Sequence, residues 1–232
     1  MKLIGITGKS GAGKTTFSNM LSKYPDVGVI HLDDLINEVK AKNYKSAMGI
    51  LMEKDSKNDK VMLKPGLKEK ILKNQILFDI FMRVRSLLVE KSLEKEINRL
   101  QKSGKTTILL DAALLKNYKC YKNLSFMILL KRPYVDRKKA LMERDGLSKK
   151  EIVRRDITNH RANRKKDLYK NRTIKIVNNN DKEELSKFAD KIYEKHFASL
   201  KSKYKVNDIK PNKYLGIDKS KTKNRINSIG EK

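Results

Sequence analysis

Short apolar runs alternate along the chain with longer segments in which apolar residues recur at helical spacing. The short runs predict strands at residues 2–7, 27–32, 106–111, 126–130 and 173–177. The longer segments predict helices at about 14–23, 35–42, 134–144, 148–159 and 181–200, and one long or two abutting helices over 67–102. Strands that alternate with helices favour a parallel sheet covered by helices on both faces, which is a three-layer α/β fold.

Residues that favour helix ends stand where these predicted helices begin and end. Ser103-Gly104 closes the long helical segment, because glycine readily adopts the left-handed conformation that follows a helix. Ser148, with Glu151 three residues later, predicts a capping box, and Asp181 predicts the cap of the last helix. Residues 54–60 are polar and show no periodicity, so we expect a loop there.

The composition suits one domain with a basic tail. The chain has 232 residues, and we expect a single α/β domain over 1–200. Residues 201–232 are polar and rich in lysine, and we expect a flexible tail. The formal net charge is +28, which fits a polyanionic partner such as nucleic acid. The lysines are scattered rather than clustered, so a solvated lysine-rich surface is the interpretation we favour.

The chain carries no sign of secretion or of a membrane span. Cys120 is its one cysteine, so no intrachain disulfide is possible, which fits a reducing compartment. The opening residues 1–14 contain no apolar segment of the kind found in signal peptides. No window approaches the roughly 18 uninterrupted apolar residues that a membrane span requires. We therefore expect a cytoplasmic protein.

Residues 8–15 (GKSGAGKT) match the phosphate-binding pattern G-x-x-x-x-G-K-[S/T] in full, between a predicted strand and a predicted helix. The glycines let successive backbone N–H groups point at phosphate oxygens, and the start of the helix adds its positive end. We expect Lys14 to bridge the β- and γ-phosphates of ATP and Thr15 to bind Mg²⁺. The predicted nucleotide-binding residues are Gly8, Lys9, Ser10, Gly11, Ala12, Gly13, Lys14, Thr15 and Thr16.

Three carboxylates follow predicted strands, at the edge of a parallel sheet where ligands bind. We expect Asp33 to act as the general base on an acceptor hydroxyl or to bind Mg²⁺, and Asp34 to cap the next helix. Asp111 has three possible roles, which are holding Mg²⁺ through water, binding the acceptor, or capping a helix. His31 is expected to pack beside the end of the sheet.

Arginines gather late in the chain, from Arg144 through 154–155 to Arg161 and Arg164. Guanidinium groups neutralise the charge that spreads over a phosphoryl group during transfer, and a mobile lid that carries them excludes water. We expect Arg144 to be catalytic and Arg155 and Arg161 to bind substrate. A solvated basic helix is the alternative interpretation of this segment.

Several segments together resemble the dephospho-coenzyme A kinase family, over about residues 1–194. They are IGITGKSGAGKTTF, VIHLDDL, ILLDAALL, ALMERDGLSKKEIVRR and IVNNNDKEEL. The resemblance implies a P-loop kinase of coenzyme A biosynthesis, with acceptor-side helices at about 35–103 and a lid at about 144–171. It also implies that Asp111 and Leu114 lie on the substrate side and that Asn178 lies in the nucleotide-side turn.

The departures from the family pattern concentrate on the acceptor side and the lid. They are His31, Glu90-Lys91, Ala113, Asn117 and Ala140, which stand where the family has other residues. The resemblance gives the first hypothesis, which is phosphorylation of the ribose 3′-hydroxyl of dephospho-coenzyme A, with a small molecule as the partner, and the departures keep other acceptors open. The alternatives are a nucleoside or nucleotide kinase similar to uridine kinase, and a non-catalytic nucleotide-binding protein associated with RNA. The oligomeric state is left open.

Overall fold

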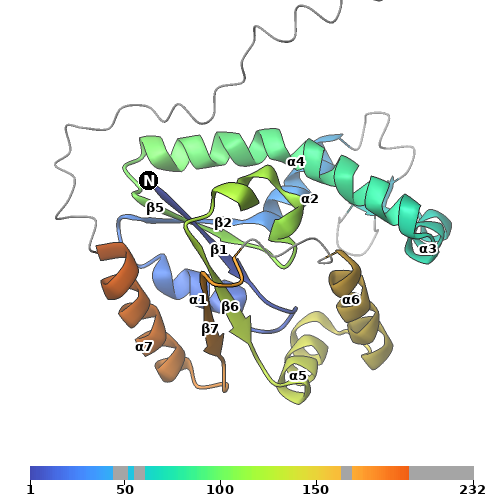
Figure 1. The fold of residues 1–232 in the computed structure, drawn as a ribbon. Coiled ribbons are helices and arrows are strands. Elements are labelled where there is room, and N and C mark those ends of the chain that lie inside the picture. Colours follow the sequence, from blue (N-terminus) through green and yellow to red (C-terminus); the bar gives the residue numbers. More distant parts are fainter. Residues whose placement is uncertain (44–51, 55–60, 163–168, 199–232) are drawn as a thin grey trace, which may run out of the picture. The chain divides into compact units, whose positions relative to one another are not determined.

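A five-stranded parallel sheet forms the centre of the computed structural model, which describes residues 1–43, 52–54, 61–162 and 169–198 (Figure 1). The strand order is β2-β5-β1-β6-β7. The bounds are β1 (Lys2–Thr7), β2 (Val27–His31), β5 (Thr107–Asp111), β6 (Phe126–Lys131) and β7 (Thr173–Val177). All five predicted strands are confirmed. Because every pairing is parallel, the carboxyl ends of the strands meet at one edge.

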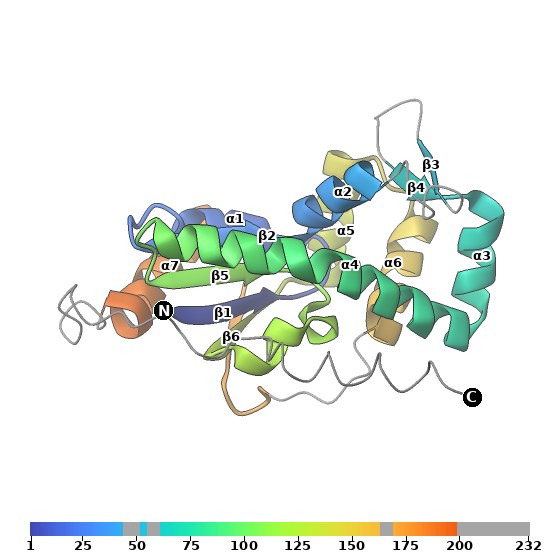
Figure 2. The same cartoon turned by 90° about the horizontal axis from the view of Figure 1, so that it is seen from above.

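Helices cover both faces of this sheet, so the predicted three-layer α/β fold is confirmed. The helices are α1 (Lys14–Leu21), α2 (Leu32–Asn43), α3 (Pro65–Lys73), α4 (Gln75–Lys102), α5 (Tyr134–Asp145), α6 (Lys149–Ala162) and α7 (Lys182–Ile192). Short turns η2 (Leu115–Asn117) and η3 (Lys119–Asn123) follow β5, and η4 (Tyr193–Phe197) follows α7. Figure 1 shows α4 along one face of the sheet and α1 and α7 along the other. In Figure 2, α3 and the first turns of α4 extend beyond the sheet edge, on the same side as α6.

The core on the α4 face forms where alternate side chains of β5 pack against one face of helix α4. Ile108 and Leu110 of β5 are fully buried, and they point to the same face because side chains alternate along a strand. Val89, Leu93 and Ile97 of α4 recur every four residues and are buried in the same cluster. Burial of a side chain of this size stabilises the fold by roughly 1.5–3 kcal/mol.

The long helical segment is two abutting helices. Asn74 separates them, with φ −108° and ψ 121°, and its side-chain oxygen accepts hydrogen bonds from the N–H groups of Ile76 and Leu77. This asparagine is therefore the N-cap of α4. The far end closes at Gly104, whose φ of +85° suits glycine, as the sequence predicted.

The capping predictions agree with the hydrogen bonds. Ser148 and Glu151 form the reciprocal bonds of a capping box: the Ser148 N–H donates to Glu151 Oε2 at 2.8 Å, and the Glu151 N–H donates to Ser148 Oγ at 3.3 Å. Asp181 accepts from the N–H groups of Glu183 and Glu184 at the start of α7. The caps that the sequence assigned to the start of these two helices are confirmed.

Three local predictions were wrong. Helix α2 begins at Leu32, so Asp33 and Asp34 both lie in its first turn and Asp34 is not the cap. Residues 52–54 and 61–63 pair as a two-stranded antiparallel sheet, β3 (Met52–Lys54) with β4 (Val61–Leu63), although Lys54 was expected in a loop. The last helix ends at Ile192 and continues as the π-helical turn η4.

Residues 1–197 form one compact unit. The predicted tail at 201–232, residues 55–60 of the predicted loop and residues 163–168 of the predicted lid lie outside the described residues. Among the helices that are described, none is long and apolar enough to cross a membrane.

Candidate active site

The loop between β1 and α1 lies at the carboxyl edge of the sheet, beside the ends of β5 and β6. Two of its glycines lie where a side chain does not fit. A Cβ on Gly8 would come within 2.3 Å of the Leu130 carbonyl oxygen, and a Cβ on Gly13 would come within 2.4 Å of Asn178 Nδ2. Both residues also have positive φ, +149° and +94°. The loop therefore keeps its curvature through glycine.

Asn178 holds this loop from the neighbouring part of the sheet. It follows β7, is buried, and donates from Nδ2 to the Ala12 carbonyl oxygen at 3.0 Å. Its Oδ1 accepts from the Asn180 N–H at 3.0 Å, which fixes the amide orientation. The asparagine that the resemblance assigned to the nucleotide-side turn thus supports the loop backbone.

Lys14 is the basic group at the centre of the site. It begins α1, and its Nζ donates to the Lys9 carbonyl oxygen at 3.4 Å. Burial lowers its pKa, the carboxylates of Asp111 and Asp33 offset part of that effect, and Arg144 and Arg137 lower the pKa further. Two carboxylates and two guanidinium groups therefore act electrostatically on this ammonium group.

Asp111, Thr15 and His31 form one hydrogen-bonded cluster. Thr15 Oγ1 donates to Asp111 Oδ2 at 3.0 Å, and His31 Nδ1 lies 3.0 Å from the same oxygen. The carboxylate is only 5% exposed, because it ends strand β5, which lies inside the sheet between β2 and β1. The sequence analysis placed His31 beside the sheet end but missed this contact, and its register opposite Asp111 is visible only once β2 and β5 are paired.

These oxygen groups fit the requirements of Mg²⁺. Magnesium is usually held by one or two carboxylates, a hydroxyl, water and the phosphates of the nucleotide. Thr15 and Asp111 supply a hydroxyl and a carboxylate in contact, next to the phosphate loop. Asp33 is exposed in the first turn of α2, and its charge reaches Lys14. In the part of the chain that is described, no group of three or more His, Cys, Asp or Glu residues could hold a metal by itself.

Two arginines that the sequence analysis did not single out hold the outer side of the loop. Arg137 of α5 is 2% exposed and donates to the Ser10 carbonyl oxygen at 2.9 Å. It also pairs with Asp156 of α6, at 2.7 and 3.3 Å. Arg132 donates to the Gly11 carbonyl oxygen at 3.1 Å. Arg132 directly follows the carboxyl end of β6, and that position in the sequence could have marked it as a site residue.

The predicted lid arginines lie on α5 and α6. Arg144 and Arg155 both pair with Asp145, at 2.7 and 3.4 Å. Both side chains are largely exposed, so these pairs are weak. Arg161 lies near the end of α6, and its side chain is outside the described part of the chain. Arg144, unlike Arg155, acts electrostatically on Lys14.

Leu114, which the resemblance assigned to the substrate side, lies in the segment that follows β5. It is partly buried against the small apolar cluster of Ile71, Phe78 and Met82, which joins α3 to α4. Thr16, the last residue of the predicted nucleotide-binding set, is exposed in the first turn of α1. The segment after β5 therefore begins at Asp111, which contacts the phosphate loop, and reaches α3 and α4 through Leu114.

A parallel sheet with a glycine loop, a loop lysine and a strand-end carboxylate defines a P-loop nucleotide-binding fold. The family model described as dephospho-CoA kinase matches residues 2–184, and the chain belongs to this family. It is a family of ATP-dependent kinases in coenzyme A biosynthesis.

Two solved structures share this fold at low sequence identity. TT1252 from Thermus thermophilus has a TM-score of 0.61 and 20% identity, over 84% of this chain and 97% of the other. The dephospho-CoA kinase from Campylobacter jejuni has a TM-score of 0.52 and 18% identity, over 84% of this chain and 96% of the other. No curated protein sequence matches the chain.

Proposed function

We propose that this protein transfers the γ-phosphate of ATP to the ribose 3′-hydroxyl of dephospho-coenzyme A. The observation that carries the proposal is the cluster at the end of β5, where Thr15 contacts Asp111 directly after the phosphate loop, in a chain of this kinase family. A loop that presents amides, an ammonium group and a carboxylate on one edge suits phosphoryl transfer, which depends on positioning and electrostatics.

The roles follow from charge and position. The loop amides and Lys14 bind the phosphates, and the lowered pKa of Lys14 reflects burial that binding of an anion would compensate. Asp33 lies exposed in the first turn of α2, and there it accepts the proton of the acceptor hydroxyl. Arg144 steadies the charge on the transferred group. Bound Mg²⁺, held by Thr15 and Asp111, would neutralise phosphate charge.

The adenine of ATP is proposed to lie beside the turn after β7. Asn178 already uses its amide to support Ala12, so its role toward the nucleotide is to position the loop. On the acceptor-side helix α4, Glu90 is one of the departures from the family pattern, and its Oε1 accepts from the Lys119 N–H at 3.1 Å. That contact makes Glu90 a support for the turn η3.

The test is a coupled assay of ADP release with purified protein, ATP and Mg²⁺. The acceptor panel contains dephospho-coenzyme A, uridine and other nucleosides, and nucleoside monophosphates. We expect dephospho-coenzyme A to give the highest kcat/KM. If a nucleoside or a nucleoside monophosphate gave the highest kcat/KM, the proposed acceptor would be wrong and the protein would still be a kinase. Absence of turnover with every acceptor, together with tight, salt-sensitive RNA binding, would instead favour a non-catalytic nucleotide-binding protein.

Lys14→Ala tests the mechanism in the same assay. We expect kcat to fall by at least about 10²-fold, because a cation directed at the transferred phosphate is removed. Lys23→Ala is the matched control, since Lys23 lies beyond the end of α1 and pairs with the surface residue Asp190. Full turnover in the Lys14 variant would refute the proposed mechanism.

A further inference from the structure

Helix α4 carries an apolar stripe on the exposed face of its first half. The stripe consists of Ile76, Leu77, Ile80, Val84 and Leu87, each of which is 40–71% exposed. From Leu77 onward its members recur at intervals of three, four and three residues, which is the spacing of the seam between two packed helices. Apolar residues in this pattern are normally buried by a second helix.

The opposite face of α4 already has its partners. Phe78 and Met82 are buried in the small cluster that joins α3 to α4, and Val89, Leu93 and Ile97 are buried in the core over the sheet. In Figure 1 the sheet lies on one side of α4, and the helical phase places the stripe on the other side. The stripe is therefore not part of this core.

The stripe ends within the helix. Lys91, Glu94 and Asn98 follow Leu87 at intervals of four, three and four residues, so the same face becomes polar in the second half of α4. Lys91 and Asn98 are exposed. The apolar stripe is thus a bounded patch of about three helical turns, roughly 17 Å long. A contiguous apolar patch with a polar border marks an interaction site.

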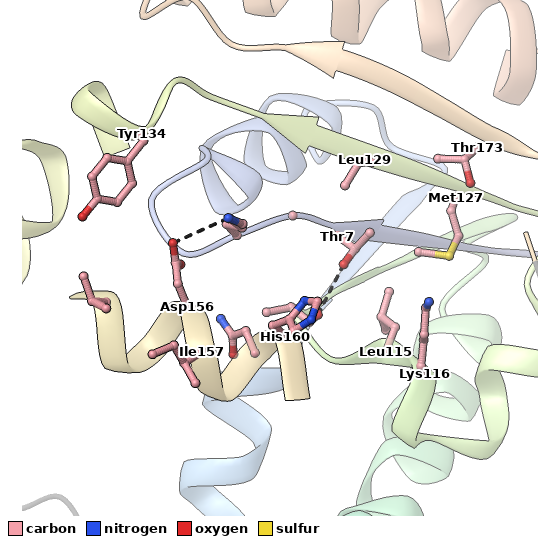
Figure 3. A pocket seen from close by; sticks show the side chains of 15 residues that line it. Thr7, Leu115, Lys116, Met127, Leu129, Tyr134, Asp156, Ile157, His160 and Thr173 are labelled. Atoms are coloured by element: carbon pink, nitrogen blue, oxygen red, sulfur yellow. Dashed lines mark hydrogen bonds and ion pairs between the residues drawn. The ribbon is translucent and has the colours of Figure 1, made fainter. Parts of the chain in front are cut away.

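The stripe is separate from the cavity at the candidate active site. This cavity of about 770 Å³ lies beside the phosphate loop, and Figure 3 shows Thr7, Asp156 and His160 among the side chains that line it. None of the described residues that line it belongs to α4. A molecule bound there does not account for apolar residues on the outer face of α4. The stripe is therefore better explained by a protein partner.

We propose that the stripe is the interface of a homodimer, in which α4 packs antiparallel against α4 of a second copy. With the two-fold axis opposite position 82, Leu77 lies against Leu87 of the second copy, and Ile80 lies against Val84. Both copies use the same residues, so the interface is isologous and closes on itself. This match of the stripe with its own reverse is the reason to choose a second copy as the partner.

The charged border of the stripe fits the same arrangement. Asp79 and Arg83 are both exposed, one turn apart on the same flank of the stripe. Asp79 also accepts a hydrogen bond from Gln75 Nε2 in its own helix, at 2.8 Å. In the antiparallel pair, Asp79 of each copy lies next to Arg83 of the other, which gives two equivalent ion pairs at the rim. The surface is therefore complementary to itself in apolar spacing and in charge.

The dimer is expected to be weak. Two such stripes with their borders bury on the order of 1,000 Å², which is near the lower limit for a specific interface. The formal net charge of each copy is +28, so the copies repel each other at low salt. We therefore expect a dissociation constant in the micromolar range that falls as salt is raised, because added ions screen this repulsion.

Sedimentation equilibrium of the full chain tests for the dimer. We expect the wild type to dimerise as its concentration rises, and Ile80→Asp to associate at least about tenfold more weakly, because a charge enters the apolar seam. Ile80 is 54% exposed, so the monomer keeps its fold. Val135→Asp is the control and dimerises like the wild type, because Val135 is an exposed residue of α5. A wild type that stays monomeric up to about 100 μM, or a dimer that survives in Ile80→Asp, would overturn the proposal.

Charge exchange tests the antiparallel register. Asp79→Arg alone and Arg83→Asp alone each bring like charges together in a homodimer, so we expect each variant to associate at least about fivefold more weakly than the wild type. A mixture of the two variants restores both ion pairs, because each copy supplies the charge that the other lacks. We expect the mixed dimer to approach wild-type affinity, measured with one variant fluorescently labelled. A mixture that associates no more tightly than either variant alone would contradict the antiparallel pairing and overturn the proposal.

Discussion

Gly13 is one of the two loop residues at which a single methyl group would disturb the site. The Cβ of an alanine would lie 2.4 Å from Asn178 Nδ2, the same atom that supports the Ala12 carbonyl oxygen. Its φ of +94° is also unfavourable for an L side chain. One residue therefore sets both the curvature of the phosphate loop and its attachment to β7.

We expect Gly13→Ala to weaken ATP binding at least about tenfold, since the loop amides no longer converge on one phosphate position. The measurement is the dissociation constant of ATP by calorimetric titration. Gly66→Ala is the control, because a Cβ at Gly66 meets nothing within 4 Å in α3. That variant keeps its ATP affinity and gains roughly 0.5–1 kcal/mol of stability from helix propensity. Wild-type affinity in Gly13→Ala would contradict the close approach to Asn178.

Between elements, the pair of Arg137 and Asp156 joins α5, α6 and the phosphate loop. Arg137 is nearly buried and uses one guanidinium group for both the Ser10 carbonyl oxygen and the Asp156 carboxylate. Removal of one partner from a buried pair leaves an uncompensated charge, which costs about 3–5 kcal/mol. The position of α6 and the shape of the loop are therefore energetically linked.

We expect Asp156→Asn to lower the free energy of unfolding by about 2–4 kcal/mol, below the full cost because the carboxylate is not completely buried. We also expect KM for ATP to rise more than kcat falls, because the loop loses its support while the transferring groups remain. Urea unfolding and steady-state kinetics measure the two effects. Arg155→Ala, which removes an exposed pair at 3.4 Å, changes stability by less than about 1 kcal/mol. Equal stability losses in the two variants would contradict the link.

The same elements show what the sequence could predict. The five strands and the phosphate loop follow from local patterns, because apolar runs and glycine spacing need no knowledge of distant partners. The contact of His31 with Asp111 and that of Arg137 with Ser10 join residues 80 and 127 positions apart, so only the paired strands and packed helices reveal them. The short strands β3 and β4 were missed because three residues carry too little pattern.

At the scale of the whole molecule, two tyrosines connect the C-terminal end of α7 to the segment that follows α1. The rings of Tyr24 and Tyr193 stack with centroids 3.4 Å apart, just before β2 and just after α7. Tyr193 donates from its hydroxyl to buried Asp26 at 2.8 Å, and Tyr24 donates to the more exposed Asp190 at 2.7 Å. Both hydroxyl groups thus donate to a carboxylate, and the carboxylate bound by Tyr193 is the more buried of the two.

The hydrogen bond of Tyr193 to Asp26 predicts a loss of stability in alkali. Burial raises the pKa of Tyr193 to about 12, with the carboxylate of Asp26 adding to the effect. An unfolded tyrosine titrates near about 10. Because the pKa is raised in the folded state, the contribution of the Tyr193 hydroxyl to the free energy of unfolding is fully present below a pH of about 10. It is lost as the pH rises toward about 12. We therefore expect the free energy of unfolding of the wild type to fall across that window.

Tyr193→Phe isolates the contribution of one hydroxyl. At neutral pH we expect a loss of about 1–3 kcal/mol, because buried Asp26 is left without one donor, while ATP affinity is unchanged. Between pH of about 10 and 12 its stability falls less steeply than that of the wild type, since one titrating group is absent. Tyr24→Phe is the control and loses less at neutral pH, because its partner Asp190 can bind water. Denaturant unfolding over a pH series, with phenolate absorbance as the titration signal, measures both effects. Parallel stability profiles for wild type and Tyr193→Phe would mean that the buried hydroxyl does not couple folding to pH.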